Sequence, residues 1–179
     1  MPSKLLRGGL YEPPLLIYNG GIEIKLFHGT GLFQAKKIIE EGVDLKAGRK
    51  YLDFGQGFYL TPSFQQAVAW ASRKSAPCVL EFDLSTNGLV IKQFESANLE
   101  WAAFVVDNRL HLSCSTAYDC IVGPMADAGI SNMYLFYRMG KLTREQAIRK
   151  FVGRSNGLQE VLLNEKAVRA LTFIRKVVL

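Results

Sequence analysis

The residues best suited to chemistry lie in two short motifs, His28-Gly29-Thr30 and the stretch 53–61. The second motif reads Asp-Phe-Gly-Gln-Gly-Phe-Tyr-Leu-Thr, with an aspartate and two glycines ahead of an apolar strand. Backbone so rich in glycine lets a ligand approach the main chain closely, although an ordinary tight turn has the same composition. The histidine motif one strand earlier favours a binding site over the plain turn.

The elements that must position these motifs are short. A strand over residues 22–26 is expected to deliver His28 at its end, and the apolar residues 58–60 predict another. A helix over residues 63–74 follows, because Ser63 and Gln66 have the spacing of a capping box. Trp70 flanks the apolar stripe of this helix.

The rest of the chain is an irregular mixture of short elements. Asn19-Gly20 predicts the turn of a hairpin over residues 15–26. Further helices are expected over residues 35–41, 96–107, 132–139, 144–152 and 164–170, and further strands over 78–84, 88–93, 118–122, 159–163 and 172–179. Such mixing predicts an α+β fold rather than an alternating parallel sheet.

Length and composition indicate one globular domain spanning residues 1–179. The chain is 49% hydrophobic and 21% charged, which is ordinary for a protein with a substantial core. Three cysteines without a CxxC pair, and only two histidines, predict neither a disulfide framework nor a metal site. With no apolar run near ~18 residues and no signal-peptide core, we expect a reduced, cytoplasmic protein.

The net charge of +6 is unevenly distributed. Residues 138–179 hold ten basic and three acidic side chains, a net charge of +7. These charges fit solvated helix faces, or a surface that binds an acidic partner such as nucleic acid.

The combined motifs resemble the ADP-ribosyltransferase superfamily, most closely an uncharacterised microbial branch that carries HG(S/T), DFGxGFYxT and QAxxWA. This chain has His28-Gly29-Thr30, residues 53–61 and Gln66-Ala67-Val68-Ala69-Trp70-Ala71. Further matches are Trp101, Asn108-Arg109, Tyr118-Asp119, Gly123-Pro124, Ala126-Asp127, Gln159 and Asn164-Glu165-Lys166-Ala167. The resemblance covers about residues 24–175 and leaves residues 1–22 as an N-terminal extension or hairpin. It implies a split pair of mainly antiparallel sheets with NAD bound between them.

The resemblance also implies roles for individual residues. His28 would bind a ribose hydroxyl, with Gly29 and Thr30 holding the nicotinamide amide, since an imidazole offers a donor and an acceptor. Tyr59 would stack on the nicotinamide beside Gly57. Trp70 fits either the other wall of that slot or plain core packing.

Gln159 lies where many members of the superfamily place a catalytic glutamate on the late strand, and glutamine is usual in this branch. An amide can hold the ribose 2′-hydroxyl, but it stabilises an oxocarbenium-like transition state less well than a carboxylate would. Glu160 is adjacent and is expected to point to the opposite face.

Three further residues are interpreted from their types, and two others are not. Asp53 is expected to bind the amides of the glycine loop, and Trp101 is expected in the core. Arg109 can bind a pyrophosphate or pair with a carboxylate. Asp119 and Asp127 receive no role.

The predicted function is therefore NAD-dependent mono-ADP-ribosyl transfer, with nicotinamide released and a protein or nucleic acid as acceptor. His28, Tyr59 and Gln159 are the predicted catalytic residues. An NAD glycohydrolase and an inactive NAD- or nucleotide-binding module are the alternatives. A toxin role is an analogy with the superfamily alone.

Overall fold

The computed structural model describes residues 21–112, 117–126 and 132–179. Within these ranges seven strands alternate irregularly with short helices. The strands are β1 Glu23–Gly31, β2 Phe58–Leu60, β3 Pro77–Ser85, β4 Ile91–Gln93, β5 Cys120–Ala126, β6 Ser155–Leu162 and β7 Leu171–Val178. The helices are α1 Leu32–Glu41, the 3₁₀ turn Leu45–Ala47, α2 Phe64–Ala71, α3 Leu99–Arg109, α4 Met133–Arg138, α5 Arg144–Phe151 and α6 Glu165–Arg169.

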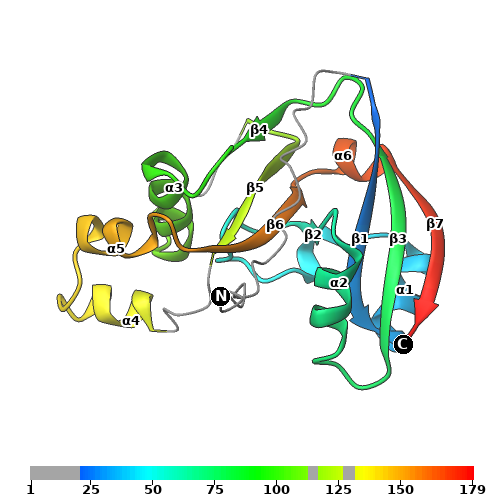
Figure 1. Ribbon diagram of the computed structural model, residues 1–179, viewed down its shortest axis with the longest axis horizontal. Coiled ribbons are helices and arrows are strands. Elements are labelled where there is room, and N and C mark those ends of the chain that lie inside the picture. The colour runs from blue at the N-terminus through cyan, green and yellow to red at the C-terminus, as the bar shows by residue number, and fades with distance from the viewer. Residues whose placement is uncertain (1–20, 113–116, 127–131) are drawn as a thin grey trace, which may run out of the picture.

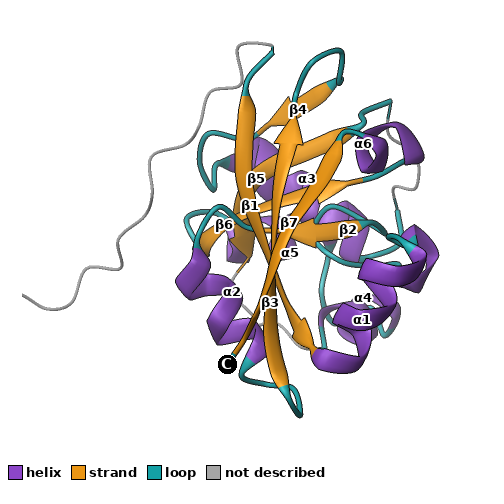
Figure 2. Ribbon diagram, turned by 90° about the vertical axis from the view of Figure 1, so that its right-hand side faces the viewer, coloured by secondary structure: helices purple, strands orange, loops and turns teal. Residues whose placement is uncertain are grey.

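The strands form two sheets, as expected for the α+β class. One has the order β1-β3-β7 and is antiparallel throughout; the other has the order β2-β6-β5-β4, in which only β4 and β5 run parallel. Figure 1 shows the three-stranded sheet at one end of the molecule, the four-stranded sheet in the middle, and α3, α4 and α5 at the other end. Figure 2 looks onto the three-stranded sheet, with the strands of the other sheet crossing behind it.

The two sheets meet where the two motifs of the sequence meet. Phe27, next to His28, forms a two-way backbone bridge with Thr61, which follows β2 directly. The N–H of each residue donates to the carbonyl of the other, at 2.8 and 2.9 Å. This bridge brings the histidine of β1 beside the tyrosine of β2.

Side-chain caps fix where several helices begin. Ser63, Asn98, Thr143 and Asn164 each accept a hydrogen bond from the backbone N–H three residues later. Such caps satisfy amides that the first helical turn leaves without partners. Thr143 and Gln146 form the complete capping box that their spacing predicts.

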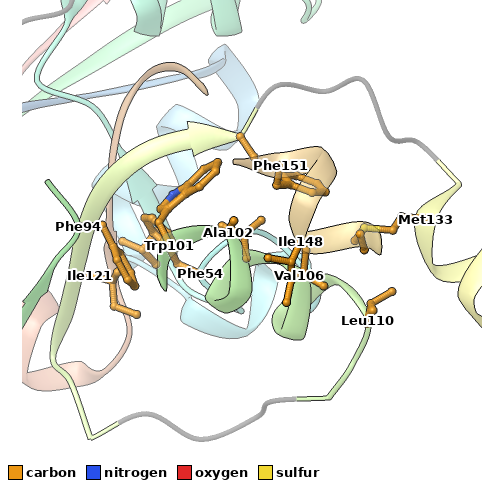
Figure 3. Close-up of a cluster of buried hydrophobic side chains, with 14 of the residues drawn as sticks. Phe54, Phe94, Trp101, Ala102, Val106, Leu110, Ile121, Met133, Ile148 and Phe151 are labelled. Carbon is orange, nitrogen blue, oxygen red and sulfur yellow. The ribbon is translucent and has the colours of Figure 1, made fainter. Parts of the chain in front are cut away.

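Two large apolar clusters lie on opposite faces of the four-stranded sheet. One packs α3 and α5 against β5 and β6 around Trp101, Phe54 and Phe151 (Figure 3). The other includes Leu26 and Leu80 of the three-stranded sheet with Phe58 and Leu162 of the four-stranded sheet. Phe58 and Tyr59 therefore leave β2 toward different clusters, because side chains alternate along a strand.

Most predicted elements are present with shifted ends. The sequence predicted His28 at the end of its strand. β1 continues to Gly31, so His28 lies inside the strand and this prediction is wrong. The helix expected over residues 63–74 ends at Ala71, and β4 is a three-residue strand. The turn predicted at Asn19-Gly20 lies outside the described residues. Among the described helices, none is long and apolar enough to cross a membrane.

Candidate functional site

Tyr59 organises the glycine loop that precedes it. Its hydroxyl donates to the carbonyl of Gly55 at 2.7 Å and accepts from the N–H of Phe54 at 3.1 Å. Gly55 has a positive φ of 88°, which favours glycine at this turn. Burial raises the pKa of Tyr59 well above its usual range, so the hydroxyl stays protonated and able to donate. The ring is partly buried against the cluster around Trp101.

The space beside Gly29 and Gly57 is filled by the protein itself. A Cβ on Gly57 would lie 2.5 Å from the carbonyl oxygen of Leu162 and 2.7 Å from Val161 Cγ1. A Cβ on Gly29 would lie 2.0 Å from the carbonyl oxygen of Ala67 in α2. These glycines are required for close packing against β6 and α2, a reason that the sequence interpretation, based on ligand approach, did not give.

His28 is held at its Nδ1 atom. Nδ1 lies 2.8 Å from the carbonyl oxygen of Tyr59, and the ring packs on Phe58 with centroids 4.6 Å apart. Because a carbonyl oxygen can only accept, Nδ1 carries the proton and Nε2 of the neutral ring is an acceptor. Burial lowers the pKa of His28 and favours that neutral form, and the nearby Lys74 acts in the same direction.

Gln159 lies on the same face of the four-stranded sheet as Tyr59. Tyr59 pairs directly with Val161, and Gln159 is two residues from Val161 along β6. Such diagonal neighbours in an antiparallel pair have Cα atoms roughly 7–8 Å apart. Glu160 pairs with Leu60 and points to the other face, as predicted, where burial and its charge raise the pKa of Cys120.

Asp53 is the centre of the polar contacts in this region. The residue is 4% exposed. Its side chain accepts from Arg109 Nε at 2.7 Å, from the Ala126 N–H at 2.9 Å and from Gln159 Nε2 at 2.9 Å. The expectation that it binds the amides of the glycine loop is therefore wrong. Tyr59 supplies the contacts to that loop, and Asp53 faces β5, β6 and α3 instead.

Arg109 takes the carboxylate alternative of the two that the sequence left open. Its Nη2 atom lies 2.5 Å from Asp53 Oδ1, and its guanidinium lies 5.2 Å from the ring centroid of Phe151. Asn108 adds a second link to the same loop by donating to the Asp53 carbonyl at 3.2 Å.

The first turn of α2 is bound to β6 by Gln66, a residue of the predicted capping box and of the QAxxWA match. Gln66 donates through Nε2 to the Leu158 carbonyl at 2.8 Å and accepts from the Leu158 N–H at 3.3 Å. Trp70 on this helix is 43% exposed, with the Arg73 guanidinium 4.3 Å from its ring centroid. The core-packing alternative for Trp70 is therefore wrong.

The other candidate residues that the structure describes are buried and make contacts within the fold. Trp101 is fully buried, as predicted, and its Nε1 donates to the Pro124 carbonyl at 2.9 Å. Thr30 is buried in β1, beside its partner Cys78 in β3. Asp119 binds the Val90 N–H together with side chains of Asn164 and Lys166. Asp127 lies outside the described residues.

The structure thus groups Tyr59, Gln159 and Arg109 around Asp53, with His28 attached through the carbonyl of Tyr59. The described residues contain no cluster of histidine, cysteine or acidic side chains that could hold a metal ion. The link between Asp53 and Gln159 spans 106 positions, and no local pattern in the sequence signals it.

A family model described as "Protein of unknown function (DUF3990)" matches residues 24–173. The chain belongs to this family. No curated protein matches the chain.

The DUF3990 match runs from β1 into β7 and includes every residue grouped around Asp53. The family description states no activity, so the site is interpreted from its own geometry. The likeness to ADP-ribosyltransferases stays a prediction.

Proposed function

We propose that this DUF3990 protein binds NAD through His28, Tyr59 and Gln159 and transfers ADP-ribose to an acceptor. The observation that carries the proposal is that one hydrogen bond and one shared sheet face bring residues of three distant strands near one another. His28 bonds the Tyr59 carbonyl at 2.8 Å, and Tyr59 and Gln159 share one face of the β2–β6 pair. These are the residues to which the ADP-ribosyltransferase resemblance gives ligand roles.

The available atoms suit a ribose. His28 Nε2 is an acceptor, and ribose hydroxyls are donors that such an acceptor can hold. In the proposed reaction the bond between ribose C1′ and the nicotinamide nitrogen breaks, and its electron pair leaves with nicotinamide. An acceptor nucleophile then forms the new bond at C1′ and loses its proton. Dipoles oriented toward the ribose would stabilise the positive charge that develops there.

Two neighbouring functions use the same site. Water as the acceptor would make the protein an NAD glycohydrolase. A binding module without turnover is favoured by one observation, the neutral amide at Gln159, which brings no full charge to the ribose. The macromolecular acceptor, protein or nucleic acid, belongs to the proposal and has no residue assigned to it.

The first experiment measures the melting temperature with and without NAD, because a ligand that binds only the folded state stabilises it. Nicotinamide release is then measured with NAD alone and with candidate proteins and nucleic acids. Release only with an acceptor supports transfer, release in water supports the glycohydrolase, and a thermal shift without release supports the binding module. The absence of any thermal shift at saturating NAD would contradict all three.

His28→Asn provides a matched variant for this experiment. The Asn Nδ2 atom occupies the place of the imidazole Nδ1 and can still donate to the Tyr59 carbonyl, whereas the Nε2 acceptor is lost. We expect His28→Asn to remove the NAD-induced shift and to keep more unliganded stability than His28→Ala. An unchanged NAD shift in His28→Asn would exclude Nε2 from the site.

A further inference from the structure

The side-chain amide of Gln159 has only one orientation that fits its neighbours. Nε2 lies 2.9 Å from Asp53 Oδ2 and 3.3 Å from the carbonyl oxygen of Pro124. A carboxylate and a carbonyl are both acceptors, so the nitrogen must face them. The rotated amide would place its oxygen against two other oxygens.

This orientation determines what Gln159 can offer to a ligand. Both Nε2 protons are directed into the protein, toward Asp53 and Pro124. None of the described residues donates a hydrogen bond to the carbonyl oxygen Oε1 of Gln159. Oε1 is also not one of the described side-chain atoms that are buried without a hydrogen-bond partner. Gln159 therefore presents an acceptor, and a donor such as a hydroxyl is the complementary group.

We propose that Asp53 is a positioning residue that holds the Gln159 amide with its oxygen toward the ligand. The part of this inference that concerns NAD rests on the proposed function; the orientation itself does not. Arg109, at 2.5 to 2.7 Å from Oδ1, supplies the positive charge that accompanies the buried carboxylate. Hydrogen bonds to an ionised group are stronger than neutral ones, so the carboxylate holds the amide more firmly than a carbonyl would.

A purely structural role is the alternative. Asp53 also accepts from the Ala126 N–H, and Gln159 and Trp101 both donate to the Pro124 carbonyl. These contacts lie at the irregular register of β5 between Pro124 and Ala126. The test must therefore measure the amide orientation, and not only stability or activity.

Asp53→Asn separates the two roles. The new Asn side chain has one acceptor oxygen for Arg109 and the other donors, and its own NH₂ group must find an acceptor. The Gln159 oxygen can supply that acceptor if the amide rotates. The positioning role predicts this rotation, which would turn the Gln159 NH₂ group toward the ligand.

Asp53→Asn combined with Gln159→Glu restores the acceptor, because both oxygens of a carboxylate accept and rotation no longer matters. A merely structural Asp53 predicts that the double variant is no better than Asp53→Asn alone. Asp119→Asn is the matched control, since Asp119 is also a buried carboxylate with three donors and touches none of these residues.

The experiment records the side-chain amide NMR signals of the full chain and the affinity for NAD. Comparison with Gln159→Met identifies the two Nε2 protons. We expect them to be shifted downfield and slow to exchange in the unmodified protein and in Asp119→Asn, and to return toward ordinary values in Asp53→Asn. We expect Asp53→Asn to weaken NAD binding by about 10-fold or more, the size of one lost charge-assisted contact. The double variant should recover most of that loss.

Ordinary shifts and fast exchange in the unmodified protein would overturn the inference without any variant. An unmoved amide signal in folded Asp53→Asn would overturn it as well. If NAD fails to bind the unmodified protein while the amide signals behave as expected, the proposed function fails and the positioning role of Asp53 stands.

Discussion

At the scale of single residues, the contacts define the chemistry more narrowly than the residue types do. The imidazole of His28 has a donor and an acceptor, but its contact with the Tyr59 carbonyl uses the donor. Gln159 likewise uses its NH₂ group inside the protein. Both side chains are left with acceptors, so we expect the site to select ligands rich in hydroxyl groups.

His28 should make the folded state sensitive to mild acid. Its pKa is lowered by burial below the ordinary value near 6.5, so the unfolded chain binds the proton more readily. The contribution of His28 to stability is therefore full above about pH 6.5 and falls as the pH drops through and below that value. We expect melting temperatures at pH 7.5 and 5.5 to differ less for His28→Asn than for the unmodified protein.

His111 is the control for this comparison, because burial and Arg138 lower its pKa too. It lies between the rings of Tyr51 and Tyr134, with centroids at 3.3 and 3.9 Å. The measurement is therefore repeated in a His111→Asn background. An equal fall in melting temperature with and without His28 would contradict the prediction.

Gln159→Glu should be damaging at neutral pH, contrary to the simple expectation that a carboxylate improves the site. The new carboxylate would lie near Asp53 Oδ2, where Nε2 now lies at 2.9 Å. Two carboxylates so close cannot both ionise readily, so the pair would retain a proton. We expect a loss of roughly 2–4 kcal/mol in the free energy of unfolding at pH 7.

The destabilisation caused by Gln159→Glu should increase with pH. A carboxyl whose pKa is raised in the folded state contributes stability at low pH and loses it as the pH rises. The difference in melting temperature between Gln159→Glu and the unmodified protein should therefore grow from pH 5 to pH 7. A constant difference would show that the repulsion with Asp53 is absent.

At the scale of elements, Asp119 joins three segments. It accepts from the Val90 N–H before β4 at 2.7 Å, from Asn164, the cap of α6, at 2.8 Å, and from Lys166 at 2.7 Å. The hydrogen bond from Lys166, followed by the Val90 amide, holds the pKa of Asp119 at about 2. The residue that the sequence left without a role thus fixes α6 beside the start of β5.

Asp119→Asn should destabilise the protein by about 1–3 kcal/mol, because the amide cannot accept from all three donors. The stability that the ionised carboxylate contributes is present above about pH 4 and is lost as the pH falls toward 2. Acid unfolding followed by circular dichroism should therefore show a smaller drop between pH 4 and pH 2 in the variant. Equal acid sensitivity of the two proteins would place the responsible carboxylate elsewhere.

At the scale of the whole molecule, the basic segment 138–179 does not form one surface. Figure 1 shows α4 and α5 at one end of the long axis and β7 at the other. Arg144 pairs with Asp107, Lys166 with Asp119 and Arg175 with Glu81. Arg144 is thus engaged by an acidic side chain of the protein itself, although 38% of its side chain is exposed. Arg149, Lys150 and Arg154 near α5 are exposed.

If nucleic acid binds, these three residues should account for much of its salt dependence. Each phosphate contact releases a counterion, so the slope of log K against log salt measures the number of contacts. We expect the triple change of Arg149, Lys150 and Arg154 to Gln to reduce that slope by about 2–3. A triple change of the exposed Lys36, Lys37 and Lys46 to Gln, outside the basic segment, is the charge-matched control. Equal slopes for the two variants would show that the salt dependence of binding follows the net charge of the protein and not the position of these three residues.

The sequence by itself determined the elements and their local signals. The cap at Thr143, the strand Phe58–Leu60 and the apolar helix around Trp101 follow from spacing and residue type within a few positions. The opposite faces of Gln159 and Glu160 follow from the period of a strand. Local sterics and backbone hydrogen bonding act over such short ranges, so sequence patterns record them.

Only the tertiary structure decided which polar side chains bind one another. Asp53 meets Gln159 of β6 and Arg109 of α3 across long separations in the sequence. Gln66 of α2 likewise meets Leu158 of β6. Residues of these types have many chemically equivalent partners, and the choice depends on which segments the apolar clusters bring together. The motifs therefore indicated the candidate residues, while packing set which of their atoms are held inside the protein.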